Sequence, residues 1–279
     1  MKKILCLILA VMTSAAVLCS CGSQSSSASG SATSANSDLA AIKANGKLVI
    51  GITEFAPMNY KAADGSWTGF ETEFAQAVCE KLGVTAEFQV INWDSKIIEL
   101  NGKTIDCIWN GMTVTDEIQQ NASVSTPYLE NRQVIVCKKG NESKFNSEKP
   151  DLKGLTVVAE KGSAGETTVT KTQKDMFSGA AYTAVDSQAT ALLEVSSGTA
   201  DCAVVDYVLS IGSIGEGTDN ASLTAVIRNE FEGEKYGIAF RKDSDVTAEV
   251  NKIITELVTS GKFKEIATKY KLQELSIAK

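Results

Sequence analysis

Apolar and polar positions along residues 39–279 alternate between short apolar runs and longer amphipathic stretches. The runs predict strands at 48–52, 87–91, 105–109, 132–137, 155–159, 181–185, 203–205, 225–227 and 236–240. Helical spacing of apolar residues predicts helices at 70–82, 189–195, 246–258 and 263–270. Asp94 is a candidate helix cap, and Asn101-Gly102 a candidate turn. Strands that alternate with helices predict an α/β fold, and the pattern restarts near residue 155, which predicts two lobes.

The first 38 residues lack this alternation. Lys2 and Lys3 precede a short, interrupted apolar run, which is typical of a secretory signal peptide over residues 1–20. The run ends at Leu18-Cys19-Ser20-Cys21, which resembles a bacterial lipobox and implies a palmitate-bearing lipid on Cys21. An ordinary signal peptide with incidental cysteines is the alternative. Residues 21–38 are rich in Ser, Ala and Gly, and they predict a flexible tether.

Charge and composition narrow the function classes. The chain has 27 basic and 34 acidic residues, a net charge of −7, which disfavours binding to nucleic acid. It has no histidine, so Ser-His and Cys-His nucleophiles are excluded and the commonest metal ligand is missing. We therefore predict a binding protein with no catalytic residue, metal or cofactor.

Four cysteines fall in the predicted folded part: Cys79, Cys107, Cys137 and Cys202. They sit among apolar neighbours and show no metal-ligand spacing. Buried free thiols are the first interpretation. A disulfide between two of them is the alternative.

Five segments, in order, carry a resemblance to a known family. They are GFETEFA at 69–75, Asn92-Trp93-Asp94, GMTVT at 111–115, STPY at 125–128 and YGIAFR at 236–241. Together they resemble the type II periplasmic solute-binding proteins of polar amino-acid ABC transporters, from about Lys47 to Tyr270. The resemblance implies a two-lobed fold, with a discontinuous first lobe (39–138 and 228–279), an inserted second lobe (139–227), and hinge strands near 134–138 and 225–229.

The resemblance also implies a function. The chain would be a monomeric, extracytoplasmic lipoprotein, held by Cys21 on the outer face of the bacterial cell membrane. It would capture an amino acid or close derivative and deliver it to an ABC permease and its ATPase. A solute-binding sensory lipoprotein is one alternative. A dehydratase on the same fold is another, with Glu54 or Glu160 as its acid–base carboxylate.

The candidate site residues follow from the resemblance. Phe55 and Trp93 correspond to its stacking aromatics, Glu54 to a partner for a cationic side chain, and Asp206 to the acceptor of the ligand ammonium. Two loops would supply N–H groups and a hydroxyl: Asn110, Gly111, Met112 and Thr113, and then Lys161, Gly162 and Ser163 at a helix start. Core packing is the alternative for the aromatics, helix capping for Asp206 and simple solvation for Glu54.

One position departs from the family pattern. Three residues after Thr115, where the family places an arginine that grips the ligand carboxylate, this chain has Ile118. A carboxylate would then depend on Thr113, on Gly162-Ser163 and on Lys161, whose point charge is less specific than an arginine. We therefore predict a wider ligand range, reaching amines and amino acids whose carboxylate is masked.

Overall fold

The computed structural model describes residues 37–278, which form one compact unit. The predicted signal peptide and Cys21 lie outside these residues, as does the predicted tether except for its last two positions. Asp38, the last of these, begins helix α1 (Asp38–Asn45), with Ser37 as its cap. Within residues 37–278, no helix combines the length and the apolar character that a membrane span requires.

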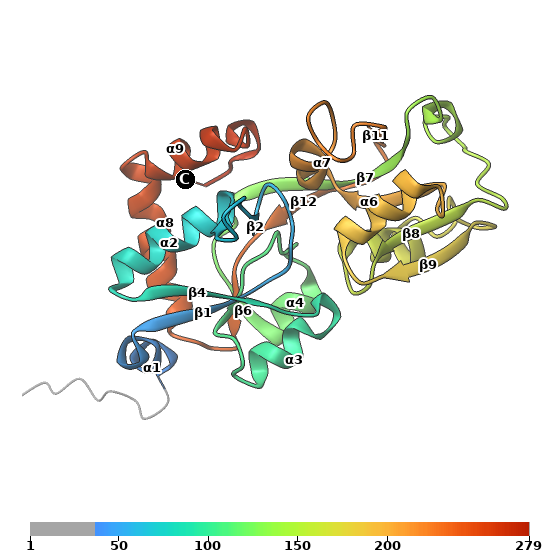
Figure 1. Ribbon diagram of the computed structural model, residues 1–279. Helices are drawn as coiled ribbons and strands as arrows, with labels where there is room; N and C mark the ends of the chain where they lie inside the picture. The colour runs from blue at the N-terminus through green and yellow to red at the C-terminus, as the bar shows by residue number, and fades with distance from the viewer. Residues whose placement is uncertain (1–36, 279) are drawn as a thin grey trace, which may run out of the picture. The chain divides into compact units, whose positions relative to one another are not determined.

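A five-stranded sheet is built from both ends of the described chain (Figure 1). Its order is β4 (Thr85–Val90), β1 (Lys47–Ile52), β5 (Cys107–Ile108), β13 (Ala239–Arg241) and β6 (Ala122–Val124). The helices in this part are α1, α2 (Phe70–Leu82), α3 (Lys96–Asn101), α4 (Asp116–Asn121), α8 (Val246–Thr259) and α9 (Lys262–Lys269). A small hairpin, β2 (Tyr60–Lys61) and β3 (Trp67–Thr68), precedes α2.

A second sheet contains the middle of the chain. Its order is β11 (Leu223–Val226), β7 (Leu129–Lys138), β10 (Cys202–Asp206), β8 (Thr156–Glu160) and β9 (Ala181–Val185), and β12 (Gly233–Tyr236) also pairs with β7. Its helices are α5 (Ala164–Thr167), α6 (Gln188–Ser197) and α7 (Tyr207–Ser213), with a π-helical turn at Thr168–Thr172. Three short 3₁₀ turns complete the fold, at Trp93–Ser95, Glu142–Lys144 and Gln273–Leu275. The α/β class and the two-sheet organisation predicted from the sequence are confirmed.

The connection between the sheets differs from the prediction. The first half of β7 pairs with β12, from Leu129 opposite Tyr236 to Arg132 opposite Gly233. The expected hinge segments, 134–138 and 225–229, do not connect the sheets. Residues 134–137 pair with β10, Lys138 pairs with β11, and residues 225–226 pair with β7, all inside the second sheet. The lobe limits 39–138, 139–227 and 228–279 stay a prediction, and this pairing favours moving them to Arg132 and Gly233.

Local predictions near the first sheet need correction. Asp94 does not cap a helix; the Asn92 side chain caps the turn instead by accepting from the Asp94 N–H at 3.0 Å. The predicted turn at Asn101-Gly102 begins one residue late, because Asn101 is the last residue of helix α3.

The expected strand 236–240 is divided, because the Gly237 N–H donates to the Met112 carbonyl and the chain then moves to the first sheet. The four cysteines are buried and free, as predicted.

Aromatic side chains of helix α2 pack against the core of the first sheet. Phe74 packs edge-on against Trp109 at 5.1 Å and against Phe263 at 4.9 Å between ring centroids. Gly83 ends the helix, as the sequence predicted, and its backbone has a left-handed conformation. This packing also buries Glu71 completely, on the side of the helix that faces the Asn110–Thr113 loop.

Candidate functional site

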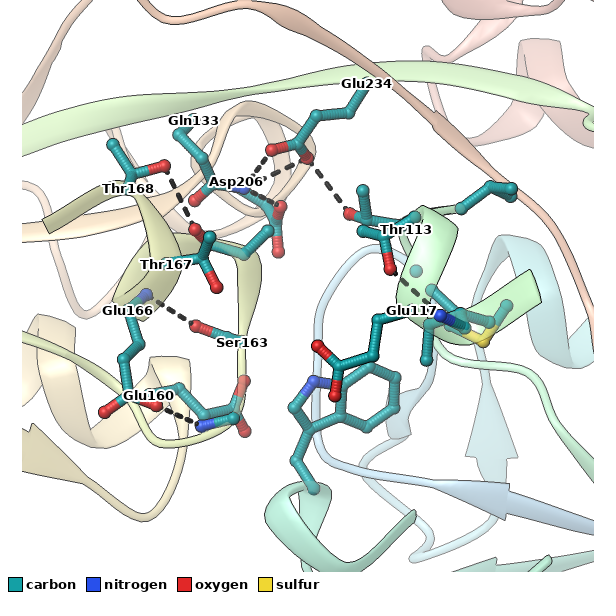
Figure 2. A pocket seen from close by; sticks show the side chains of 18 of the residues that line it. Thr113, Glu117, Gln133, Glu160, Ser163, Glu166, Thr167, Thr168, Asp206 and Glu234 are labelled. Carbon is teal, nitrogen blue, oxygen red and sulfur yellow. Dashed lines mark hydrogen bonds between the residues drawn. The ribbon is translucent and has the colours of Figure 1, made fainter. Parts of the chain in front are cut away.

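A cavity of about 1190 Å³ has walls from elements of both sheets (Figure 2). Most of the predicted site residues line it: Trp93, Asn110, Gly111, Met112, Thr113, Gly162, Ser163 and Asp206. Glu54 and Lys161 are exposed and Phe55 is buried in the core, and none of these three is among the lining residues.

Asp206 ends strand β10 at the inner end of the cavity and is only 5% exposed. Its carboxylate accepts hydrogen bonds from three side-chain amides: Asn131 at 2.5 Å, Gln133 at 2.7 Å, and Gln188. Burial raises the pKa of Asp206, while these amide hydrogen bonds oppose the rise. The side chain makes no capping bond to α7, so the capping alternative is wrong.

Glu234, on the connecting strand β12, brings a second carboxylate to the same place. It accepts from Asn131 at 2.9 Å. It also accepts from Gln133 at 3.1 Å and from the Thr113 hydroxyl at 3.0 Å, and Figure 2 shows these two bonds. Burial and the charge of Asp206 raise the pKa of Glu234 to about 7. The two carboxylates therefore share two amide donors and repel each other when both are ionised.

Glu160, at the end of β8, is a third inward carboxylate and is 3% exposed. One of its oxygens, Oε1, has no hydrogen-bond partner. Burial, together with the charge of Asp206, raises the pKa of Glu160 to about 8, while the positive charge of Lys96 and hydrogen bonding by Gln188 oppose the rise. An unpartnered buried carboxylate oxygen is costly, so this atom is available to a ligand donor.

Lys96, the first residue of α3, lines the cavity and connects two of its walls. Its Nζ donates to the carbonyls of Trp93 at 3.1 Å and Gly162 at 2.9 Å, and it lies 4.8 Å from the Trp93 ring. Burial lowers its pKa. The Trp93 ring is 7% exposed, lines the cavity and has a cation over its face.

The backbone of the Asn110–Thr113 loop is hydrogen-bonded to the buried carboxylate of Glu71. The Gly111 N–H donates to both Glu71 carboxylate oxygens at 2.9 Å, so it does not face the cavity as predicted. Burial raises the pKa of Glu71 to about 7. Gly111 has φ of 56°, and a Cβ there would come within 2.3 Å of the Phe55 ring. Phe55 therefore packs beneath the loop rather than against a ligand.

The predicted anion site at the start of α5 is occupied by the chain itself. The Gly162 N–H donates to the Glu166 carboxylate at 2.7 Å, and Ser163 accepts from the Glu166 N–H at 3.1 Å. Lys161 forms an ion pair with Asp94 at 2.9 Å. The spacing Ser163-x-x-Glu166 is a capping-box pattern that would have revealed this arrangement from the sequence.

Sequence reasoning missed several polar residues of the site: Lys96, Asn131, Gln133, Gln188 and Glu234. Asn131 and Gln133 did leave a signal, because they are alternate positions of one strand, and both side chains turn to the same side. Glu160 had been considered only as a catalytic carboxylate.

Comparisons with known proteins give the site its context. The model of the bacterial extracellular solute-binding proteins, family 3, matches residues 48–273. The L-cystine-binding protein TcyJ of Escherichia coli K12 is 29% identical over 231 residues, which is 82% of this chain and 84% of that protein.

Two solved structures are similar in fold. One is an ABC uptake transporter substrate-binding protein from Streptococcus pneumoniae with bound histidine (TM-score 0.77, 28% identity, 88% and 100% of the two chains covered). Another is the ancestral amino-acid-binding protein AncCDT-1, a precursor of cyclohexadienyl dehydratase (TM-score 0.75, 28% identity, 84% and 99% covered).

Proposed function

The chain belongs to the bacterial extracellular solute-binding proteins of family 3, and from this premise we propose that it is the receptor of an ABC importer. It captures a small solute with an amino group, an amino acid or close derivative, in the cavity between the two sheets. The names of its relatives, which bind cystine and histidine, support this class of ligand.

The observation that carries the proposal is the environment of Asp206. A carboxylate with 5% exposure and three amide donors is held in one orientation before any ligand arrives. An ammonium group that reaches it forms a charge-assisted hydrogen bond in a site with little water, which contributes roughly 1.5–3 kcal/mol. Trp93, which lines the cavity beside Lys96, contacts the apolar part of the ligand.

The remaining site residues take supporting roles. Met112 and Thr113 form one wall, and Gly162 and Ser163 form the facing one. We also propose that residues 1–20 are removed, that Cys21 is lipidated, and that the protein works as a monomer tethered by residues 21–36 to the outer face of the membrane. The two lobes close on the ligand, as in other two-lobed binding proteins.

A carboxylate-dependent dehydratase is the second candidate, and Glu160 is the observation that favours it. A buried acid with a pKa of about 8 and an unbonded oxygen has the properties of a general acid. One structural relative is a precursor of a dehydratase. Recovery of the bound ligand unchanged after long incubation identifies the receptor, and appearance of a dehydrated product identifies the enzyme.

A thermal-shift screen of the purified chain against amino acids, amino-acid amides and amines tests the receptor function. A ligand at 100 times its Kd adds about 2.7 kcal/mol to the stability of the folded state, which raises Tm by several degrees. We expect at least one such ligand. A screen in which no member of these classes raises Tm contradicts the proposal.

A further inference from the structure

We propose, on the basis of the receptor function above, that the ligand is a small organic cation with two positive charges and no free carboxylate. This selects a narrower class than amino acids in general. Diamines, guanidino amines and amides of basic amino acids belong to it. Three independent features of the cavity lead to this class.

The first feature is that three of the groups predicted to bind a ligand carboxylate already have carboxylates of the chain as partners. The Gly162 N–H donates to Glu166, and the Thr113 hydroxyl donates to Glu234. Lys161 is paired with Asp94. A ligand carboxylate would have to displace these internal partners one by one.

The arginines of the chain do not offer a substitute. Arg228 is buried against the carbonyls of Phe145 and Ser147, and Arg241 is bound to Asp38 and Asp106. The third, Arg132, lies along a separate small pocket on the other side of β12. At position 118 the cavity is lined by an isoleucine that is 8% exposed.

The second feature is the charge balance inside the cavity. Asp206, Glu234 and Glu160 are three inward carboxylates, and Lys96 is a half-buried ammonium that also lines the cavity. When all three carboxylates are ionised, two negative charges remain uncompensated. A dication would neutralise them and would favour the ionised forms over the protonated forms that burial stabilises in the ligand-free chain. The more exposed lining residues do not reverse this excess: they include Asp116, Glu117, Glu166 and Glu232, against Lys171 and Lys235.

The third feature is that the carboxylates occupy two places. Asp206 and Glu234 share the Asn131 and Gln133 amides at one place, and Figure 2 shows Glu160 apart from them. The Oε1 atom of Glu160 is buried and has no donor. One cationic group of the ligand therefore binds the Asp206–Glu234 pair and the second binds Glu160.

A metal ion is a poorer occupant than an organic cation. Across residues 37–278, no group of three or more Cys, Asp or Glu side chains is arranged to hold a metal. The Trp93 face and Met112 also line the space, and these suit the methylene chain between two cationic groups.

Isothermal titration of the purified chain with matched compounds tests the inference. The sets are lysine, ornithine and arginine, each beside its amide and beside the amine that lacks the carboxylate, with n-pentylamine as a monocation. For at least one set we expect the amide and the carboxylate-free amine to bind about tenfold or more tightly than the amino acid. We also expect 1,5-diaminopentane to bind about tenfold more tightly than n-pentylamine.

The outcomes separate this inference from the receptor function. Tighter binding of any amino acid with an intact carboxylate than of its own amide overturns the inference and leaves the receptor function standing. Absence of binding by every amino acid, amide and amine contradicts both.

A substitution at Glu160 tests whether this residue binds the second cationic group of the ligand. Glu160→Gln keeps the size of the side chain and should weaken the best dication about tenfold while changing n-pentylamine affinity less than about twofold. Glu249→Gln, in an exposed ion pair on α8, is the control and should change neither. Equal effects of Glu160→Gln on the dication and the monocation, or none on either, would show that Glu160 does not bind a cationic group.

Discussion

The hydroxyl of Thr113 donates to the carboxylate of Glu234 at 3.0 Å, across 121 residues of sequence. This bond joins the loop after β5 to the connecting strand β12, and it uses the hydroxyl that a ligand carboxylate would need. It also holds Glu234 beside Asp206, since both accept from Asn131 and Gln133. The site therefore has its own carboxylate where an amino-acid receptor would accept one from the ligand.

Replacing Ile118 with arginine should change what the cavity selects. Ile118→Arg places a planar pair of donors at a position that lines the cavity, where it can hold a carboxylate with two parallel bonds. We expect the preference for an amino acid over its amide to rise about tenfold or more. Ile118→Met, similar in volume and uncharged, is the control. The same preference in both variants would mean that position 118 does not face the ligand.

Protonation of the inward carboxylates should make stability depend on pH. The pKa of Glu160 is raised from 4.5 to about 8 in the folded chain, so the folded state binds more protons than the unfolded state between these values. The free energy of unfolding should therefore fall as pH rises from about 4.5 to about 8.

Urea denaturation of ligand-free protein at pH 5, 6, 7 and 8 measures this effect. In Glu160→Gln the fall should be smaller than in the wild type, because one of the titrating groups is gone. Identical pH profiles for the two proteins would show that burial does not raise the pKa of Glu160.

The contact between Gly111 and Phe55 predicts a specific loss of stability. Gly111→Ala combines backbone strain at φ of 56° with a clash at 2.3 Å against the Phe55 ring. Gly140→Ala is the matched control, since φ there is 90° and no atom lies within 4 Å of the added Cβ. We expect Gly111→Ala to cost about 1–3 kcal/mol more than the control. Equal urea midpoints would place Phe55 away from the loop.

The lipid anchor can be tested in a bacterial host. Cys21→Ala removes the thiol that would carry the lipid, and the protein should then leave the detergent phase on phase partitioning. Cys79→Ala, which changes a buried cysteine of the folded part, should partition like the wild type. A Cys21→Ala protein that stays in the detergent phase would contradict lipidation at this residue.

The sequence predicted the layers of the fold better than the contacts of the site. Apolar runs marked β1, β8 and β10 because a buried strand needs apolar side chains wherever it lies. The division between β12 and β13 was missed. The chain passes from one sheet to the other at Gly237, whose N–H bonds to the Met112 carbonyl, and no local sequence pattern reveals this bond.

The site shows the same limit. Asp206 could be found because it ends a buried strand and matches a family position. Glu234 could not be found, because its role depends on Asn131 and Thr113, both more than 100 residues away. The anion site at Gly162 was wrong because the capping role of Glu166, four residues later, was overlooked.

The central claim is that this cavity binds a cationic solute through Asp206. Isothermal titration of the best ligand from the thermal-shift screen into wild type, Asp206→Asn and the exposed control Asp219→Asn tests it most directly. Asp206→Asn keeps the side-chain shape and removes the charge, so affinity should fall about 10- to 100-fold, while the control stays within about twofold of the wild type. Equal affinities of Asp206→Asn and the wild type for that ligand would contradict the account.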